Sequence, residues 1–283
     1  MRVASLVPAA TEILRFLGVE PVGVSHCCDW PGKPVLTESL LPKGLPQAEI
    51  DRRVRQAVQS GQSLYRVRTE LLEALRPDLI LTQGVCEVCA VGPAELRRAV
   101  DCLSFAAPSL RLEGTRLAHL WDDLRAVAAA IGVSVEPKIA ALQGRLERVQ
   151  QAVAGYRRPR VAFVEWLEPP FLGGHWVPDL VEAAGGMPVG PGPEAPSLRT
   201  TWAEIAALEP QKLLFSFCGY GLAEALQELS TWDNPHPGLE AWVLDSAYFC
   251  ALTPWVVRGV EILAGLLHPE AWPAPEPSEA VRR

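Results

Sequence analysis

The chain has 283 residues, of which 49% are hydrophobic and 21% charged, with a formal net charge of -7. A chain of this length has room for two domains of ordinary size, and this composition excludes a disordered protein. No basic stripe and no apolar run of 18 residues occur, so we expect neither a nucleic-acid partner nor membrane insertion.

Residues 1–112 alternate short apolar runs with helical patterns, which is typical of a mostly parallel sheet covered by helices. We therefore predict an N-terminal α/β lobe in this region. The expected strands are Val3–Val7, Pro21–Ser25 and Leu79–Thr82, and the expected helices are Thr11–Leu17, Ile50–Gln59, Thr69–Leu75 and Pro93–Val100.

The first residues do not resemble a secretory signal. Pro8 and Glu12 interrupt the apolar stretch, and no cleavage-site pattern follows before Pro21. The seven cysteines are an odd number in a chain too long to need disulfide bonds, which favours a reducing compartment. As written, the sequence predicts a cytoplasmic protein, or else the mature form of a periplasmic or cell-surface protein.

Residues 113–156 are rich in Ala, Leu, Arg and Gln, and their apolar positions repeat every three or four residues. This spacing predicts two helices, the first ending at Gly132 and the second beginning near Pro137. The second helix would span about 18 residues, or about 27 Å. We interpret the region as a helical connector.

Residues 157–283 return to alternating strands and helices and predict a C-terminal α/β lobe with a Pro-rich tail. The lobes repeat each other weakly: Leu72–Thr82 aligns with Ile205–Phe215 without a gap, and in both a helix is followed by Pro and a strand. We expect an α/β fold of two similar lobes, each a mostly parallel sheet flanked by helices, joined by a long rigid helix. Ligands of such sheets bind beyond the carboxyl ends of the strands.

The sequence resembles the helical-backbone substrate-binding proteins of ABC importers, which include vitamin B12 and siderophore receptors. The stretches "VASLVPAATEILRFLG", "LLEALRPDLILTQ" and "GGHWVPDLVEAAGG" carry this resemblance across nearly the whole chain. More narrowly, it resembles the subgroup usually labelled cobalamin-binding. Four motifs are similar to that subgroup: "SHCCDWP" from Ser25, "TQGVCEVCA" from Thr82, "EWLEPPFLGGHWVP" from Glu165 and "FCGYG" from Phe217.

The resemblance implies a solute-binding protein that holds a corrinoid such as cobalamin, or a related metal complex, between its lobes for ABC-type import. It also implies an ABC permease as partner, contacted through one acidic residue on each lobe. Glu70, seven residues before Pro77, matches this position in the first lobe. Glu204 is the candidate in the second lobe, although it lies six residues before Pro210 and so departs by one from the pattern.

Aromatic and histidine side chains within these motifs are the candidate ligand contacts. Trp and Tyr rings can flank a flat macrocycle, and a neutral imidazole can ligate cobalt or another metal. Core packing is the ordinary alternative for any single Trp, and a packed or capping residue is the ordinary alternative for a lone His. The predicted ligand-binding residues are His26, Trp30, Tyr65, Gln83, Trp166, His175, Trp176 and Tyr220.

Cys86 and Cys89 form a CxxC pair directly after a predicted strand. A structural zinc site needs four ligands, and no second CxxC exists, so Cys28, Cys218 and His26 would have to complete a zinc or iron site. This defines the alternative function of a cytoplasmic metal- or metallocofactor-binding protein. A buried structural pair of thiols and a redox pair remain the other interpretations.

Catalysis is the third alternative. Four acidic residues near the same loops could act as acids or bases: Asp29, Glu87, Glu165 and Glu168. The sequence nevertheless contains no nucleophile elbow, P-loop or GxGxxG motif. We therefore predict that the protein is not an enzyme.

Overall fold

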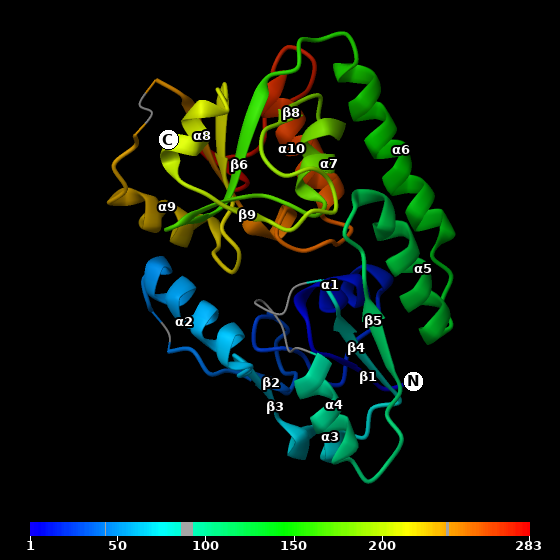
Figure 1. The fold of residues 1–283 in the computed structure, drawn as a ribbon. Helices are drawn as coiled ribbons and strands as arrows, with labels where there is room; N and C mark the ends of the chain where they lie inside the picture. Colours follow the sequence, from blue (N-terminus) through cyan, green and yellow to red (C-terminus); the bar gives the residue numbers. More distant parts are fainter. Residues whose placement is uncertain (43, 86–92, 236–237) are drawn as a thin grey trace. The chain divides into compact units, whose positions relative to one another are not determined.

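The computed structural model of the chain describes residues 1–42, 44–85, 93–235 and 238–283. Contacts between Cα atoms divide the chain into two compact units. Unit 1 comprises Met1–Gly114 and Trp121–Val135, and unit 2 comprises Thr115–Leu120 and Glu136–Arg283. Each unit is built around its own sheet, and Figure 1 labels most of their helices and strands.

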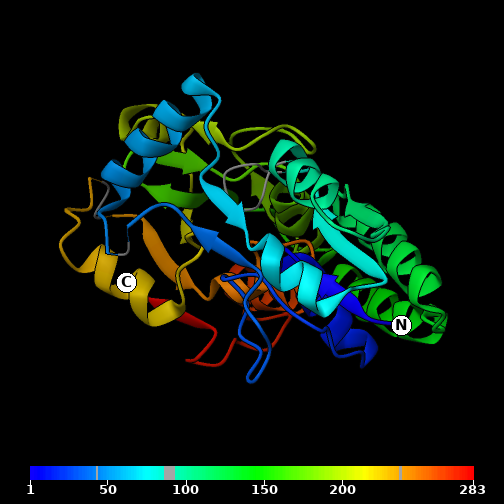
Figure 2. The ribbon, with the colours of Figure 1, turned by 90° about the horizontal axis from the view of Figure 1, so that it is seen from below.

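Unit 1 combines a parallel three-stranded sheet, in the order β1-β4-β5, with the antiparallel pair β2-β3. In Figures 1 and 2, α2 lies beyond the β2-β3 pair, away from the parallel sheet. The elements are β1 (Val3–Ser5), α1 (Pro8–Leu17), β2 (Thr37–Ser39), α2 (Gln47–Ser60), β3 (Tyr65–Val67), α3 (Thr69–Leu75), β4 (Leu79–Gln83), α4 (Pro93–Asp101) and β5 (Ser109–Leu112).

The first helix of unit 1 illustrates how the local sequence sets its bounds. Pro8 occupies the first turn of α1, where its missing N–H costs no hydrogen bond. Gly18 ends the helix with φ of 78°, a left-handed conformation that suits glycine. Ile13 and Leu14 are fully buried. The helix thus covers the start of the parallel sheet with one apolar face.

The predicted strand Pro21–Ser25 does not form a regular strand. It contributes only the isolated bridges of Gly23 with Ala4 and of Val24 with Val35. Three strands of unit 1 were not predicted, namely β2, β3 and β5, each only three or four residues long. Strands this short carry too few alternating residues to stand out as a period of two.

Unit 2 has a seven-stranded mixed sheet whose central strands β6, β10 and β11 run parallel. Its elements are η1 (Leu117–His119), α6 (Glu136–Val153), β6 (Arg160–Leu167), β7 (Pro170–Leu172), α7 (Val177–Ala183), β8 (Met187–Pro188), β9 (Leu198–Arg199), α8 (Trp202–Ala207), β10 (Lys212–Phe215), α9 (Leu222–Ser230), β11 (Glu240–Leu244), η2 (Ser246–Tyr248), α10 (Val256–Leu267) and β12 (Ala280–Arg282). Helix α5 (Leu120–Ile131) begins at the last residue of Thr115–Leu120 and continues in unit 1.

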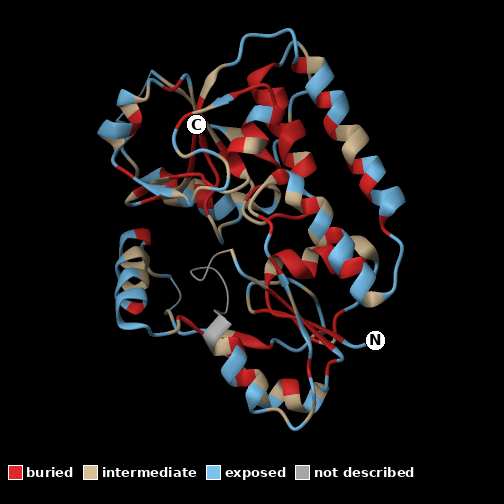
Figure 3. Ribbon diagram, turned by 45° about the vertical axis from the view of Figure 1, so that its right-hand side comes forward, coloured by how far each residue is buried: buried red, intermediate tan, exposed pale blue. Residues whose placement is uncertain are grey.

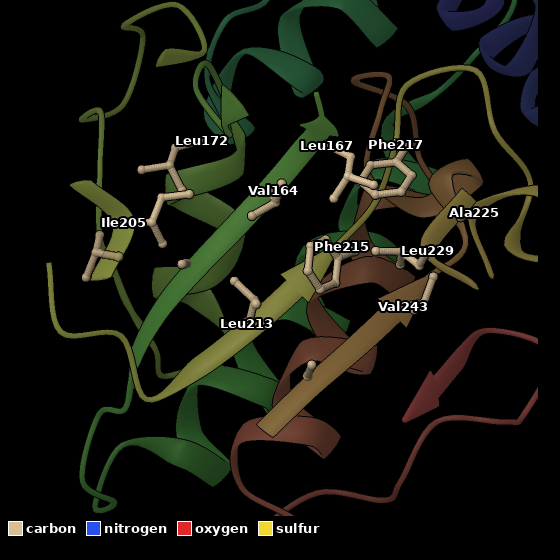
Figure 4. Packing of buried hydrophobic residues seen from close by; sticks show 13 residues of the cluster. Val164, Leu167, Leu172, Ile205, Leu213, Phe215, Phe217, Ala225, Leu229 and Val243 are labelled. Atoms are coloured by element: carbon tan, nitrogen blue, oxygen red, sulfur yellow. The ribbon is translucent and has the colours of Figure 1, made fainter. Parts of the chain in front are cut away.

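Alternate residues of the central strands pack toward α8 and α9. Val164, Leu213 and Phe215 form one buried cluster with Ile205 of α8 and Leu229 of α9, and Figure 4 shows these side chains gathered on one face of the sheet. On the other side, α10 is buried on nearly its whole circumference (Figure 3). The buried residues include Glu261 as well as many apolar side chains, so α10 is a central element of unit 2.

The helical pattern predicted for residues 113–156 is confirmed by α5 and α6. Gly132 follows α5 with φ of 75°, and Pro137 lies in the first turn of α6. Helix α6 is 18 residues long, as its apolar spacing predicts. Its buried side chains recur every three or four residues: Ile139, Leu142, Leu146, Val149 and Val153.

The predicted internal repeat also takes the expected form. Helix α3 ends at Leu75 and β4 begins at Leu79, while α8 ends at Ala207 and β10 begins at Lys212. Both copies are therefore a helix followed by a strand of a parallel sheet. The predicted α/β class is confirmed by these two units, each with parallel strands flanked by helices.

The end of the chain, predicted as a tail, contributes the strand β12 to the sheet of unit 2. It pairs antiparallel with β11, and Trp242 aligns with Arg282. Alternation is hidden by the surrounding prolines, which explains why the sequence pattern missed this strand. Among the helices of the described residues, none combines the length and apolar character that a bilayer crossing requires.

Candidate functional site

The carboxyl ends of β6 and β10 bring two predicted ligand-binding residues of unit 2 together. Trp166 is the penultimate residue of β6, and Tyr220 follows β10 after a short turn. Their rings meet edge to face with centroids 5.9 Å apart. Both side chains are half-buried, so each keeps a surface accessible to solvent.

An aromatic chain connects this pair to the core. Tyr220 contacts Phe217 at 6.1 Å, and Phe217 contacts Phe215 at 5.9 Å between ring centroids. Phe215 and Phe217 are fully buried, as Figure 4 illustrates. The indole nitrogen of Trp166 donates to the backbone oxygen of Glu168 at 3.1 Å. The buried aromatic rings and the hydrogen bond to Glu168 therefore hold Trp166 and Tyr220 in position.

Glu165 lies beside this aromatic pair, at an irregularity in the pairing of β6 with β7. The register shifts between Val164 and Trp166, which leaves Glu165 as an extra residue in β6. A bulge of this kind re-aims a side chain at the end of a strand. The Glu165 carboxylate accepts a short hydrogen bond from Ser197 Oγ. The bulge therefore brings a carboxyl group against the segment that precedes β9.

Burial raises the pKa of the Glu165 carboxyl to about 7, and the hydrogen bonds from Ser197 and from the backbone of Gly174 only partly offset it. From the sequence alone, Glu165 is a candidate only as an acid or base. Its contact with Ser197, 32 residues away, carries no local sequence signal. The carboxyl can therefore change charge near neutral pH.

His175 is held in an uncommon backbone conformation with φ of 51°. Its N–H donates to Ala195 O at 2.7 Å, and its carbonyl accepts from the N–H of Glu194 at 3.2 Å. A Cβ on Gly174 would lie 2.4 Å from Ala195 O, so only glycine allows the two segments to approach this closely. These contacts present the half-buried imidazole at the start of α7.

The indole nitrogen of Trp176 anchors this side chain to the core. The indole Nε1 donates to Phe249 O at 2.7 Å, and the ring lies 5.8 Å from that of His175. Burial lowers the pKa of His175, which keeps its imidazole neutral at physiological pH. A neutral ring next to a fixed indole can donate a hydrogen bond, accept one or ligate a metal.

In unit 1, His26 lies within a network of hydroxyl and thiol groups. His26 Nδ1 is 2.8 Å from Thr37 Oγ1, and His26 Nε2 is 3.2 Å from Cys27 Sγ. The ring packs against Tyr65 with centroids 5.3 Å apart. Burial lowers the pKa of His26, and the protein atoms packed around the Cys27 sulfur raise the pKa of Cys27, although that residue as a whole is exposed. The pair is therefore a neutral imidazole facing a thiol.

Cys28 has a different environment from Cys27. Cys28 Sγ is 3.0 Å from Thr11 Oγ1, which in turn lies 2.7 Å from Ser5 Oγ at the end of β1. Burial raises the pKa of Cys28 to about 11, and the hydrogen bond with Thr11 offsets this only in part. The thiol predicted as a metal ligand is thus protonated and bonded to an internal hydroxyl.

The remaining ligand-binding candidates of unit 1 differ in accessibility. Arg15 places its guanidinium carbon 4.4 Å from the centroid of the half-buried Trp30 ring. Tyr65 is only 9% exposed, and its ring packs against that of His26. Gln83 is half-buried at the end of β4. Trp30 and Gln83 are therefore partly accessible to solvent, whereas Tyr65 is buried against His26.

The predicted cysteine metal site is only partly visible. Cys86 and Cys89 lie outside the described residues, as does Glu87. Cys28 belongs to unit 1 and the half-buried Cys218 to unit 2. Within the part of the chain that the structure describes, no three His, Cys, Asp or Glu side chains gather in a metal-binding arrangement. The other two acidic candidates, Asp29 and Glu168, are exposed.

The two residues predicted to contact a permease occupy comparable places. Glu70 is exposed in the first turn of α3. Glu204 is exposed in the first turn of α8, where its carboxylate accepts hydrogen bonds from Thr201 N at 2.9 Å and Thr200 Oγ1 at 2.9 Å. These bonds lower the pKa of Glu204 and complete a capping box. Docking remains a prediction for both residues.

No known family model matches the sequence. Several solved structures resemble the fold along nearly its whole length. A periplasmic heme binding protein from Pseudomonas aeruginosa is 20% identical with a TM-score of 0.70, and the match covers 99% of this chain and 97% of that one. The periplasmic vitamin B12 binding protein BtuF of Vibrio cholerae is 18% identical with a TM-score of 0.67, covering 94% and 96%. An ABC transporter substrate-binding protein from Listeria monocytogenes is 18% identical with a TM-score of 0.68, covering 95% and 98%.

The fold is therefore that of the class III periplasmic binding proteins. This agrees with the resemblance that the sequence motifs indicate. The likeness spans both units, because at least 94% of the chain is covered in each comparison.

Proposed function

We propose that this protein is the substrate-binding protein of an ABC importer and that it binds a metal-containing organic ligand. The observation that carries the proposal is the aromatic pair Trp166–Tyr220 at the carboxyl end of the unit 2 sheet, in a fold of the class III type. The neighbouring structures support it, since two of them are described as binding heme and vitamin B12. Carboxyl ends of parallel strands are the usual ligand edge of α/β sheets.

In unit 2 the ligand would rest on Trp166 and Tyr220 and meet His175. Two rings already fixed by the core offer flat apolar surface at little further entropic cost. The His175 imidazole is neutral, so it can reach a metal or a polar substituent without first losing a proton. Trp176 holds His175 in place through its bond to Phe249.

In unit 1 the candidate contacts are His26, Trp30 and Gln83, all half-buried. The Tyr65 ring packs against the His26 ring and supports it. The finer proposal is a corrinoid such as cobalamin, because four sequence motifs resemble the cobalamin-binding subgroup. Heme is the nearest competitor, since it shares the flat macrocycle and the central metal.

The proposed role is binding and delivery without turnover. Glu70 and Glu204 would contact the permease, Glu70 directly from the first turn of α3. Glu204 would first have to give up hydrogen bonds to Thr200 and Thr201. An importer receptor works on the outer side of the inner membrane, so the proposal places the functional form in the periplasm or at the cell surface.

The test is calorimetric titration of the purified chain with cyanocobalamin and, separately, with hemin. We expect saturable one-to-one binding of one of them. Trp166→Phe and His175→Ala should each weaken it by about tenfold, equivalent to about 1.4 kcal/mol. Trp242→Phe is the matched control, because Trp242 lies in the middle of β11 and bonds to Glu240. Absence of saturable binding for both ligands, or equal weakening by the control, would contradict the proposed site.

A further inference from the structure

The buried hydroxyl of Thr37 determines which nitrogen of His26 carries the proton. Thr37 Oγ1 donates its hydrogen to Ser25 Oγ at 3.2 Å, and both residues are shielded from solvent. The same oxygen lies 3.0 Å from the backbone nitrogen of His26 and 2.8 Å from His26 Nδ1. A hydroxyl has one hydrogen, so Nδ1 must be the donor in this contact. The Nε2 atom of the neutral ring therefore keeps its lone pair.

That lone pair is directed at a thiol. Cys27 Sγ lies 3.2 Å from His26 Nε2, and Cys27 is exposed. The ring itself is fixed on two sides, by Thr37 at Nδ1 and by Tyr65 against its face. A fixed nitrogen donor thus stands beside a sulfur donor that solvent can reach.

We propose that His26 Nε2 and Cys27 Sγ form a two-donor site for a soft or borderline metal centre, the class to which Zn²⁺, Cd²⁺ and Cu⁺ belong. Tetrahedral bonds of about 2.0 Å to nitrogen and about 2.3 Å to sulfur would separate the two donors by about 3.5 Å. The observed 3.2 Å needs only a small rotation of the exposed Cys27 side chain. Imidazole and thiolate together suit this class of metal better than Mg²⁺ or Ca²⁺.

Two protein donors do not fill a coordination sphere, so the remaining ligands must come with the metal. This part of the inference rests on the proposed function, in which the metal arrives within an organic complex. On binding, the Cys27 S–H bond breaks, the sulfur–metal bond forms, and the proton passes to solvent. His26 contributes its lone pair and keeps the Nδ1 proton on Thr37. A metal-binding histidine commonly makes such a hydrogen bond with its other nitrogen.

The neighbouring Cys28 is excluded from this site by its own contact. Its Sγ is 3.0 Å from Thr11 Oγ1, on the side of the loop that faces the end of β1. Two consecutive cysteines therefore have opposite roles in this inference. Substituting each cysteine in turn gives two matched variants, which lack the thiol at one or the other of two adjacent positions.

The test uses Cd²⁺ as the probe and the full chain carrying Cys86→Ser and Cys89→Ser, which removes the thiols of the CxxC pair. Calorimetry measures affinity, and near-ultraviolet absorption detects the thiolate–metal bond. We expect one saturable Cd²⁺ per chain, with affinity reduced about tenfold or more by Cys27→Ser and by His26→Gln. Cys28→Ser should change it by less than about twofold. Thr37→Val should weaken binding yet retain the thiolate band, because Thr37 only positions the ring.

Unchanged affinity in Cys27→Ser or His26→Gln, an equal loss in Cys28→Ser, or no saturable Cd²⁺ binding would overturn the inference. A second measurement does not depend on the folding of any variant. Cd²⁺ should protect Cys27 from alkylation in the unaltered chain, as located by peptide mass, and lack of protection also overturns it. If Cd²⁺ fails to bind while cyanocobalamin or hemin binds, only this inference fails. The reverse result removes the proposed function and leaves the metal site.

Discussion

The guanidinium of Arg116 donates two hydrogen bonds to the carboxylate of Asp179, from Nε at 2.9 Å and from Nη2 at 2.8 Å. The backbone N–H of Leu117 adds a third at 3.0 Å. The Asp179 side chain is only 10% exposed. This carboxylate therefore fixes the segment that leads into η1 against the first turn of α7, the helix that follows His175 and Trp176.

Replacing Asp179 by Asn should lower the free energy of unfolding by about 2 kcal/mol, because hydrogen bonds to charged groups are lost in a partly buried place. The measurement is the urea unfolding midpoint of the variant against the unaltered chain. Asp122→Asn is the matched control, since Asp122 is 79% exposed in its pair with Arg125. We expect the control to change stability by less than about 0.5 kcal/mol. Equal effects of the two substitutions would show that the Arg116 contact adds little.

Glu165 gives a pH-dependent prediction. Its carboxyl has a pKa of about 7 in the folded chain, against 4.5 for an unperturbed glutamate carboxyl. A raised pKa means that the folded state binds the proton more tightly, so the stabilisation is complete below about pH 4.5 and is lost as pH rises to about 7. The loss is about 3 kcal/mol at most. Glu165→Gln should remove this dependence and be more stable than the unaltered chain at about pH 8.

The comparison between variant and unaltered chain is essential, because two histidines act in the opposite direction. Burial lowers the pKa of His26 and His175, so they destabilise the fold as pH falls below their usual value of 6.5. Subtracting the two unfolding profiles cancels their contribution and leaves that of Glu165. A difference that does not vary between about pH 4.5 and pH 7 would mean that Glu165 ionises normally.

Much of the fold could be predicted because its main elements are long and strongly patterned. The apolar spacing of α6 and the paired helix–strand units around Pro77 and Pro210 are local features of the sequence. Short strands such as β3, with three residues, exist only because a partner strand supplies their hydrogen bonds. The strand β12 likewise depends on its pairing with β11, so no local sequence pattern predicts it.

For the candidate site, the sequence predicts residues whose ligand-binding role stays a prediction, and only some of their contacts follow from it. His175, Trp166 and Tyr220 stand in recognisable motifs, and the structure brings Trp166 and Tyr220 into contact. The contact between Glu165 and Ser197 requires a bulge in β6 and a distant loop, neither of which has a sequence signal. Cys27 was overlooked in favour of Cys28, because only the side-chain directions distinguish two adjacent cysteines.

The hydrogen bonds of Glu261 in α10 lead to a prediction of how the stability of the fold changes in acid. It accepts hydrogen bonds from Arg145 of α6 at 2.8 Å and from Arg258 at 3.1 Å, and Arg258 also donates to Glu279. Burial opposes ionisation of Glu261, but these hydrogen bonds outweigh it and lower its pKa below 4.5. A depressed pKa gives stability that is present above about pH 4.5 and is lost as pH falls through the folded value.

Glu261→Gln should therefore lower stability by about 2–3 kcal/mol near neutral pH. The same variant should lose less stability than the unaltered chain on acidification below about pH 4.5. Thermal unfolding at the two pH values measures both effects. Glu12→Gln is a suitable control, because Glu12 pairs with Arg15 on the surface at 3.3 Å. If acidification destabilises the variant as much as the unaltered chain, carboxylates other than Glu261 account for the loss of stability in acid.

Substitutions at Gly185 and Gly132 test how closely His268 is packed in unit 2. Both glycines end or follow helices in the left-handed region, with φ of 82° and 75°. A Cβ at Gly132 would meet no atom within 4 Å, whereas at Gly185 it would lie 2.6 Å from His268 Nε2. That nitrogen is 3.1 Å from Gly185 O, and His268 is 2% exposed, so the ring has little room to move.

Gly132→Ala should cost about 1–2 kcal/mol, the conformational penalty of a left-handed residue with a side chain. Gly185→Ala adds overpacking against a buried ring, so it should cost about 1–3 kcal/mol more. The difference between the two unfolding midpoints isolates the crowding from the backbone penalty that both variants share. Equal costs would mean that His268 rotates away and that its hydrogen bond to Gly185 is not needed to hold the end of α7 against α10.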